Sequence, residues 1–553
     1  MSTPEPTAAR PVLSDGQWAR LRAYGTEQPT GVGEALFRDG EHAGDMILVG
    51  SGEVEIVRPD TSDAGEAVVA RYGPGEFSGE LNLLTGQSTY LSARVSKSGV
   101  VFRVGPPSFR RLMNEDPELS DVVLRALLAR REDLRTNAAT RTIVIVGQDA
   151  SAEAMALRTY AARQRQPHTW VSADDEAGAA LAKAVSADTD DLPLVITPTR
   201  VLRRATTSDL ADHLGLSYRP VAGETLDLLV IGAGPAGLAA AVYGASEGLQ
   251  TLVLDSVAAG GQAAASSRIE NYLGFTSGIS GADLTGRAVV QAQKFGARIA
   301  SPCVVVSLEA TAERLRVVLR DGTEITGRAA VIATGASYRS LPLDRWADFE
   351  GAGIYYAATE LEARACGPQP VTVVGGANSA GQAALYLAGR GCAVSLVVRG
   401  ADLEAGMSSY LADRIVAHPS VTVRTSTEVT ALHGGDRLEG ITVSGKGEGG
   451  QPTVLDCRGL FCFIGARPAT EWLSGVAMDD HGFVLTDVGI DDAALGAPWT
   501  ALGRRPLPFE TSLPRVFATG DVRAGSMKRV AAAVGEGASA VRSVHMSLSV
   551  LPV

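Results

Sequence analysis

Two segments of the same kind constrain this chain more than any other feature: each is a short apolar strand that runs into small residues and then into a helix. They begin at Leu228 and Val371, about 140 residues apart. From Leu226 onward, strand-like and helix-like segments alternate, which predicts βαβ units and parallel sheets. At about 150 residues per domain, the 553 residues leave room for further domains before this region.

The first segment has the spacing of a dinucleotide-binding turn. Its turn residues are Gly232, Gly234, Pro235, Ala236 and Gly237. The first glycine permits the tight turn, the second lets a pyrophosphate approach the backbone, and the third lets the helix pack on the strand. The next strand, 251–254, ends at Asp255, an acid about 20 positions on that suits a ribose hydroxyl. Strand, glycines, helix, strand and acid in this order predict a dinucleotide site.

The second segment departs from this spacing. Its turn residues are Gly375, Ala377, Asn378, Ser379 and Ala380, with alanine at the second and third glycine positions. An approaching phosphate therefore has one more methyl group to accommodate. The following strand, 394–398, ends at Arg399. A site for NADP offers such a cation to the 2′-phosphate, whereas a site for NAD offers an acid to the hydroxyl, so the sequence predicts that NADPH binds here.

Further short motifs follow the first turn. They contain Gly261 and Gln262, then Asn271, then Ala333, Thr334 and Gly335, and near the C-terminus Gly520 and Asp521 followed by Arg529, Val530 and Ala531. Together with the two turns, they resemble the thioredoxin reductase-like members of the pyridine nucleotide-disulfide oxidoreductase family, from Leu226 to about Ser547. The resemblance implies a flavoprotein that uses FAD and NADPH.

The resemblance also gives each motif a place. The first two motifs would line the flavin ring, and the third would be the strand end where the chain leaves the FAD domain. Asp521 would hold the ribityl chain and the diphosphate, and the backbone from Arg529 onward would face the flavin. The implied FAD-binding domain comprises 226–343 and 469–553, and the NAD(P)H-binding domain comprises 344–468. The nucleotide domain of such proteins rotates about its two joints, here near Leu341–Asp344 and Arg467–Thr470, and a homodimer is implied.

Cysteines are missing where disulfide-reducing members of the family have them. Those members carry CxxC just before the second dinucleotide turn, and alignment places Ala357 and Glu360 at the two positions. The five cysteines are Cys303, Cys366, Cys392, Cys457 and Cys462. Their odd number and scattered spacing argue against a disulfide framework and a zinc site. Neither a catalytic side chain nor a metal ligand is assigned.

The segment 141–217 resembles a thioredoxin or glutaredoxin fold, with Pro193 at the cis-proline position, and a linker follows over 218–225. Such folds carry CxxC after the first strand, whereas this chain has no cysteine in 148–153. Because thiol exchange needs a thiolate, we expect this domain to serve as a spacer or docking surface.

The first domain, 1–137, alternates apolar and polar residues from 34 to 104, which predicts antiparallel strands, and has helical periodicity from 117 to 135. Its arginines Arg125, Arg130, Arg131 and Arg135 are expected on a solvated face. The runs 73–77 and 79–84 resemble a cyclic nucleotide-binding domain, in which Glu80 would take the ribose hydroxyl. The position of the phosphate-binding arginine holds Thr89 and Tyr90, and the first arginine is Arg94. A degenerate sensor or assembly domain and a cyclic nucleotide receptor both remain open.

The charge balance excludes some partners. A formal net charge of -12 repels phosphate backbones and anionic membrane surfaces, which excludes nucleic acid and membranes as first hypotheses. The sequence has no apolar run of about 18 residues and no signal-like N-terminus, so a cytoplasmic protein is expected.

We therefore predict an α/β protein with two Rossmann-like dinucleotide-binding domains, preceded by a β-roll cyclic nucleotide-binding-like domain and a small thioredoxin-like domain. The leading hypothesis is an FAD enzyme that passes electrons from NADPH to a non-disulfide acceptor, such as a ferredoxin, a flavodoxin, a quinone or a small molecule. Two alternatives remain. One is disulfide reduction that uses a partner's dithiol, and the other is a cyclic nucleotide-linked sensor or scaffold.

Overall fold

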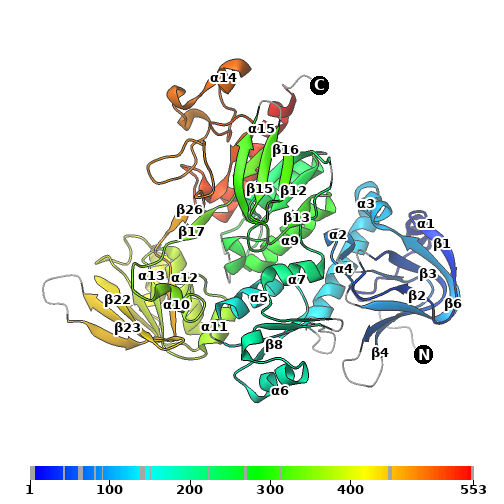
Figure 1. The fold of residues 1–553 in the computed structure, drawn as a ribbon, viewed down its shortest axis with the longest axis horizontal. Coiled ribbons are helices and arrows are strands. Elements are labelled where there is room, and N and C mark those ends of the chain that lie inside the picture. Colours follow the sequence, from blue (N-terminus) through cyan, green and yellow to red (C-terminus); the bar gives the residue numbers. More distant parts are fainter. Residues whose placement is uncertain are drawn as a thin grey trace.

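Four folded parts follow one another along the chain in the computed structural model (Figure 1). The structure describes residues 7–41, 44–59, 66–79, 82–89, 91–136, 143–149, 151–197, 200–221, 223–266, 269, 271–311, 314–445 and 451–549. The N-terminal part is blue in Figure 1, the second part is cyan to teal, and the nucleotide domain is yellow. The predicted class, α/β with two Rossmann-like domains, is confirmed.

The N-terminal domain is an antiparallel roll. Its elements are α1 (Asp15–Arg22), β1 (Thr26–Thr30), β2 (Ala35–Phe37), β3 (Met46–Pro59), β4 (Glu66–Tyr72), β5 (Phe77–Ser78), α2 (Asn82–Thr85), β6 (Ser92–Val104), α3 (Pro106–Glu115) and α4 (Pro117–Thr136). The sheet order is β1-β6-β3-β4, with β2 on β6 and β5 on β3, and all pairs are antiparallel. The predicted antiparallel strands and the helix after Pro117 are confirmed.

Two arginines of α4 are not on a solvated face, which corrects the sequence-based expectation. Arg130 is 8% exposed and donates to the carbonyl oxygens of Phe77 and Gly79. Arg131 is 3% exposed and donates to the side chain of Gln87. Buried carbonyl and amide oxygens of the adjoining loop need donors, and the arginines supply them.

The second domain has a four-stranded sheet in the order β10-β9-β7-β8. Its elements are β7 (Ile143–Gly147), α5 (Ala152–Arg163), β8 (His168–Ser172), α6 (Glu176–Ala184), η2 (Thr189–Asp191), β9 (Leu194–Ile196), β10 (Val201–Leu202) and α7 (Thr207–Leu214). β7 is parallel to β8 and antiparallel to β9. The peptide bond before Pro193 is cis, as the resemblance to thioredoxin implied.

The third part is formed from two stretches of the chain around one sheet. Its elements are β11 (Leu226–Ile231), α8 (Pro235–Ser246), β12 (Thr251–Leu254), η3 (Gln262–Ala265), α9 (Gly281–Lys294), β13 (Arg298–Ala300), β14 (Val305–Ala310), β15 (Leu315–Leu319), β16 (Glu324–Ile332), η4 (Asp487–Gly489), η5 (Asp492–Ala494), α14 (Ala497–Leu502), β27 (Val516–Ala518), η6 (Gly520–Val522) and α15 (Val530–Ser549). The order is β13-β12-β11-β16-β15-β14, with β27 parallel to β16. The carboxyl ends of β11, β16 and β27 meet at one edge, where ligands of such sheets bind.

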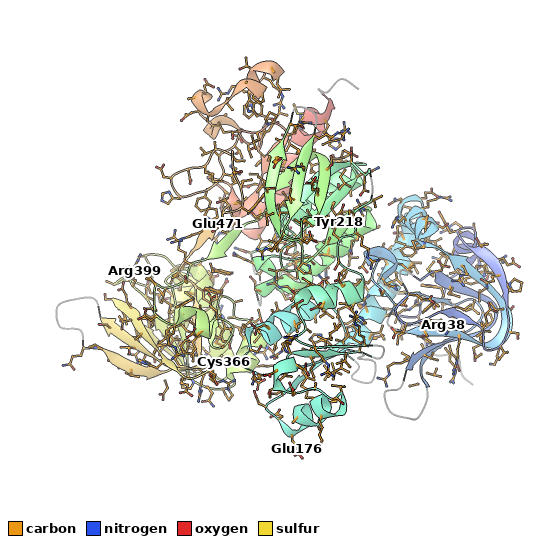
Figure 2. All side chains as sticks on the ribbon, in the orientation of Figure 1. Arg38, Glu176, Tyr218, Cys366, Arg399 and Glu471 are labelled. Atoms are coloured by element: carbon orange, nitrogen blue, oxygen red, sulfur yellow. The ribbon has the colours of Figure 1, made fainter. Side chains whose placement is uncertain are left out.

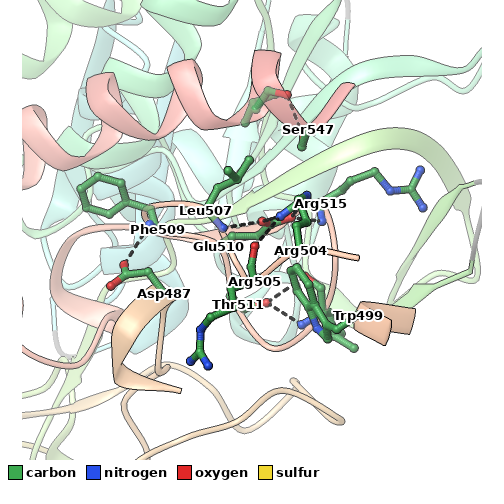
Figure 3. Close-up of polar contacts among 12 residues, drawn as sticks. Asp487, Trp499, Arg504, Arg505, Leu507, Phe509, Glu510, Thr511, Arg515 and Ser547 are labelled. Atoms are coloured by element: carbon green, nitrogen blue, oxygen red, sulfur yellow. Dashed lines mark hydrogen bonds and ion pairs between the residues drawn. The ribbon is translucent and has the colours of Figure 1, made fainter. Parts of the chain in front are cut away.

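A buried carboxylate fixes the chain before β27 (Figure 3). Glu510 is 0% exposed and accepts from Arg504 at 2.6 and 3.0 Å, and from the backbone N–H groups of Leu507 and Arg515 at 2.8 Å each. A buried charge needs such complete pairing. The network therefore anchors the loop that leads into β27.

The nucleotide domain is inserted between these two stretches. Its elements are α10 (Trp346–Phe349), β18 (Ile354–Tyr355), α11 (Glu360–Cys366), β19 (Val371–Val374), α12 (Asn378–Gly389), β20 (Val394–Val397), α13 (Ser409–Val416), β21 (Val421–Arg424), β22 (Thr427–Gly434), β23 (Leu438–Gly445), β24 (Thr453–Asp456) and β25 (Gly459–Cys462). A five-stranded parallel sheet, β18-β25-β19-β20-β21, stands beside the antiparallel sheet β22-β23-β24. The two connections to the third part pair as β17 (Ala336–Tyr338) and β26 (Ala466–Pro468), a two-stranded ribbon.

Helix α5 ties the second domain to its neighbours. Its Met155 packs in the hydrophobic core of the nucleotide domain. Ala258 of the third part packs in the core of the second domain. None of the described helices is long and apolar enough to cross a membrane.

Helices α8 and α15 cross at a point with no space for a side chain. A Cβ built on Gly537 would lie 2.0 Å from the carbonyl oxygen of Ala236. On the same helix, a Cβ on Gly535 meets nothing within 4 Å.

We therefore expect Gly537→Ala to lower the free energy of unfolding by about 1–3 kcal/mol through overpacking. Gly535→Ala is the matched control and should raise it by up to about 1 kcal/mol, because alanine favours helix. Thermal unfolding measured by circular dichroism and calorimetry gives both values. Equal effects of the two substitutions would contradict the close crossing.

Candidate functional site

A cavity of about 690 Å³ lies where the third part, the nucleotide domain and the second domain meet. The sequence-predicted residues that line it are Gly232, Gly234, Pro235, Ala236, Asp255, Gly261, Gln262, Ala333, Thr334, Gly335, Ser379, Gly520, Asp521, Arg529 and Val530. Motifs from both stretches of the third part thus meet around one space.

The glycine turn leaves no space for side chains where the backbone packs, and open space where a ligand would approach. A Cβ on Gly232 would lie 2.3 Å from the carbonyl oxygen of Ala333, and one on Gly237 would lie 1.8 Å from that of Gly232. At Gly234 the nearest atom to a built Cβ is the Cα of Gly261, at 3.9 Å. The turn therefore offers open backbone at the N-terminus of α8, which suits a pyrophosphate.

Asp255 lies at the carboxyl end of β12, as predicted. Its two carboxylate oxygens accept from the backbone N–H groups of Ala233 at 2.8 Å and Val257 at 2.9 Å. Burial raises the pKa of this carboxyl despite these bonds. The carboxylate is thus held in a fixed orientation at the edge of the cavity.

The segment after β27 presents unsatisfied polar atoms to the cavity. Thr519 is 0% exposed, and its hydroxyl has no partner among the residues that the structure describes. Burial raises the pKa of the neighbouring Asp521. Glu536 fixes this segment because it accepts from the backbone N–H of Gly520 at 2.7 Å and pairs with Arg523 at 2.7 Å. Open glycine backbone, an orphan hydroxyl and a buried acid fit the FAD that the resemblance implies.

The remaining flavin motifs differ in their placement. Gln262 donates through its side-chain amide to the carbonyl oxygen of Ala336, at the start of the ribbon. Asn271 is exposed and does not line the cavity, so its predicted contact with the flavin stays a prediction. Ala531 lies in α15 outside the lining.

Two stacked tyrosine rings form part of the cavity wall. Tyr338 and Tyr356 stack with ring centroids 5.5 Å apart and planes at 4°, and both line the cavity. Ala357 also lines it, whereas Glu360 pairs with Arg364 at 2.9 Å. Neither Ala357 nor Glu360 has a thiol, and none of the described residues that line the cavity is a cysteine.

The second dinucleotide turn is tightly packed. A Cβ on Gly375 would lie 2.4 Å from the carbonyl oxygen of Phe463. Ala377 caps α12, and Asn378 accepts from the backbone N–H of Ser408 at 2.8 Å. Ala380 is buried in the domain core. These residues shape the turn, and only Ser379 of this set reaches the cavity.

Arg399 is exposed just beyond the end of β20 (Figure 2). Within the described part of the chain, no hydrogen bond or ion pair engages its guanidinium. Arg424 ends the neighbouring strand β21 in register with Val397, and its Nε has no partner among the described residues. This second cation could not be predicted from the sequence, because the topology of the sheet decides which strands are neighbours.

The five cysteines are all buried and none is bonded to another. Burial raises the thiol pKa to about 11 for Cys303 and Cys457 and to about 12 for Cys366 and Cys462. Thiolate is the reactive form, so these thiols are chemically inert at neutral pH. Across the described residues, no cluster of His, Cys, Asp and Glu side chains could hold a metal ion.

A separate cavity of about 240 Å³ lies in the N-terminal domain, and Ser78, Thr89 and Arg130 are among its lining residues. The Ser78 hydroxyl is buried and has no partner among the described residues. Arg94 pairs with Glu55 at 3.1 Å instead of facing this cavity. Glu80 and Tyr90, which the sequence analysis placed near the ligand, lie outside the described residues.

The sequence matches two described families. Residues 226–537 match the pyridine nucleotide-disulphide oxidoreductase family, and residues 31–116 match the cyclic nucleotide-binding domain. Thioredoxin reductase of Streptomyces clavuligerus is 32% identical over 327 residues, which are 59% of this chain and 94% of that protein. Thioredoxin reductase of Treponema pallidum is 30% identical over 330 residues, 59% of this chain and 98% of that protein.

Solved structures agree with these matches. The structure of T. acidophilum thioredoxin reductase is 26% identical, with a TM-score of 0.52 over 59% of this chain and 99% of that chain. Lactococcus lactis thioredoxin reductase in the FR conformation is 26% identical, with a TM-score of 0.51 over 59% of this chain and 100% of that chain. Because the family match spans more than half of its residues, this chain belongs to the pyridine nucleotide-disulphide oxidoreductase family, as a thioredoxin reductase-like, FAD- and NADPH-dependent flavin oxidoreductase fused to an N-terminal cyclic nucleotide-binding domain.

Proposed function

We propose that the chain transfers two electrons from NADPH through FAD to an acceptor that is not a disulfide. The proposal rests on the resemblance, which places Ala357 and Glu360 at the two cysteine positions, and on the cavity, which Ala357 lines together with Tyr338 and Tyr356. The second domain has no cysteine in 148–153 either, and all five cysteines of the chain are buried. Electrons therefore have no dithiol route within this chain.

In this proposal the cavity of about 690 Å³ is the FAD site. When bound there, FAD supplies the chemistry of hydride acceptance from the nicotinamide. The glycine turn binds the pyrophosphate, Asp255 accepts a hydrogen bond from the ribose, and Asp521 with Thr519 binds near the ribityl chain. NADPH would give up a hydride, which is two electrons and one proton, and leave as NADP⁺. The two electrons would pass to the acceptor, and the proton would pass to the acceptor or to water.

The nucleotide domain binds NADPH through its glycine-containing turn and Arg399. The ribbon β17–β26 is the hinge on which this domain brings the nicotinamide toward the flavin. Thr334 stabilises the base of the ribbon by donating to the carbonyl oxygen of Ala469 at 2.9 Å. We propose that the nucleotide domain of this chain rotates as the nucleotide domain does in other members of the family.

An anaerobic titration of the purified, FAD-loaded chain tests the reductase. We expect NADPH to bleach the visible flavin band at one equivalent per FAD, because the chain has no second two-electron centre to fill. A reductase that contains a dithiol would consume two equivalents of NADPH per FAD. Flavin that stays oxidised with both NADPH and NADH would overturn the proposal in favour of a sensor or scaffold.

Thiol labelling tests the electron route. Under native conditions we expect iodoacetamide to label none of the five cysteines, before or after NADPH reduction, because burial keeps the thiols protonated. The denatured chain is the control and should take up five labels. New thiols that appear upon reduction would instead favour disulfide chemistry.

The coenzyme preference tests Arg399. Because hydrogen bonds to charged groups contribute about 1.5–3 kcal/mol, Arg399→Ala should raise the KM for NADPH by about 10- to 100-fold. NADH lacks the 2′-phosphate and serves as the internal control, so its KM should not change. A parallel rise for both coenzymes would place Arg399 outside the phosphate site.

The acceptor class is tested by comparing substrates for the NADPH-reduced chain. We propose that ferredoxin, flavodoxin or a quinone reoxidises the flavin, whereas oxidised thioredoxin does not. Rapid reoxidation by a partner's disulfide would support the alternative in which another protein supplies the dithiol.

A second proposal concerns the N-terminal domain. The family match over 31–116 and the unpartnered Ser78 hydroxyl in the cavity of about 240 Å³ support a small ligand there. We propose that this ligand regulates the rate of flavin reduction, with a cyclic nucleotide as the first candidate. Repeating the NADPH titration with cAMP and with cGMP decides whether either changes the rate of flavin reduction.

The homodimer and the cytoplasmic location remain predictions from the sequence.

A further inference from the structure

The last turn of α5 in the second domain is fixed against the FAD-binding part. The Tyr160 hydroxyl donates to the carbonyl oxygen of Ser301 at 2.8 Å, and the Gln164 amide donates to the Ser301 hydroxyl at 2.8 Å. Ala258, a few residues beyond Asp255, is part of the core of the second domain. The position of this helix end relative to the dinucleotide turn is therefore fixed on both sides.

Between these anchors, Arg163 lines the cavity together with Gly232, Gly234 and Asp255. Considering the described residues alone, its guanidinium has no hydrogen bond and no ion pair. The charged groups that act on it are Asp255 and Glu362. The two oxygens of Asp255 accept from backbone N–H groups, and no hydrogen bond joins them to Arg163 among the described residues.

The charges around the cavity require such a cation. Four carboxylates line it, those of Asp255, Glu350, Glu362 and Asp521. The lining cations are Lys528, Arg529 and Arg163. Lys528 lies 4.2 Å from the centroid of the Phe483 ring and acts electrostatically on Asp521. Of the three lining cations, Arg163 is the one that acts on Asp255, so a pyrophosphate dianion at Gly234 would have Arg163 as the cation on the Asp255 side.

We propose that Arg163 binds the pyrophosphate of FAD, so that the cysteine-free thioredoxin-like domain is a structural part of the cofactor site. The proposal rests on the proposed function, in which FAD occupies this cavity. A guanidinium suits the role because its planar donors bind phosphate oxygens in pairs and keep their charge when buried. The domain then contributes Arg163 to the cofactor site, and its Ala152 also lines the cavity.

The test measures FAD affinity in the full-length chain. Flavin-depleted protein is titrated with FAD, and binding is followed by the quenching of flavin fluorescence. We expect Arg163→Gln to raise the Kd for FAD by about 10- to 100-fold, the range for hydrogen bonds to charged groups. Arg163→Lys keeps the charge but loses the paired, planar N–H donors of the guanidinium. Its Kd for FAD should therefore lie between those of the wild type and the glutamine variant.

Arg165→Gln is the matched control. Arg165 is at the same interface, pairs with Asp283 at 3.4 Å and does not line the cavity. We expect its Kd for FAD to equal that of the wild type. Circular dichroism reports whether each variant is folded, and the lysine variant keeps the test decisive if the glutamine variant does not fold.

Each result decides between specific statements. Wild-type affinity in Arg163→Gln would overturn the inference and leave the proposed function intact. Equal losses in Arg163→Gln and Arg165→Gln would also overturn it, because the interface and not the cavity cation would then be responsible. Loss of NADPH binding with FAD binding unchanged would assign Arg163 to the other coenzyme. Failure of the wild-type chain to bind FAD would contradict the proposed function itself.

Discussion

Backbone packs directly on backbone at three places around the start of α8, and the rest of the site depends on these contacts. Gly232 packs on the end of β16, Gly237 on the carbonyl of Gly232, and Gly537 of α15 on the carbonyl of Ala236. Because no side chain separates these segments, the ends of β11 and β16 and the helices α8 and α15 lie close together. The N-terminus of α8 is then left facing open space.

Local chemistry explains what the sequence could predict. The glycine turn, Asp255 and Asp521 are set by neighbours close in sequence or by a recurring strand order, so their grouping around one cavity followed from pattern. Contacts between residues far apart in the sequence explain what the sequence could not predict. The periodicity of α4 distinguished apolar from polar positions, but it could not indicate that Arg130 would donate to carbonyls of a loop 51 and 53 residues away.

The position of Arg163 could not be predicted from the sequence either, because it depends on contacts between two domains. In the sequence it is one basic residue at the end of a helix whose domain has lost its cysteines. Its place beside the dinucleotide turn arises only because Tyr160 and Gln164 attach that helix to Ser301. Tyr338 and Tyr356 were missed for a similar reason, because the ribbon and the nucleotide domain bring them together from separate elements.

The position of Met155 has a consequence for motion. Its side chain is 9% exposed and belongs to the core of the nucleotide domain, although its helix is fixed to the FAD-binding part. A rotation of the nucleotide domain on its ribbon would withdraw this side chain into water, at a cost of about 1.5–3 kcal/mol for full exposure. This free-energy difference would make the orientation seen here roughly 10- to 100-fold more populated than a rotated one. The second domain, which has no thiol for exchange, would in this way set how often the two cofactor sites meet.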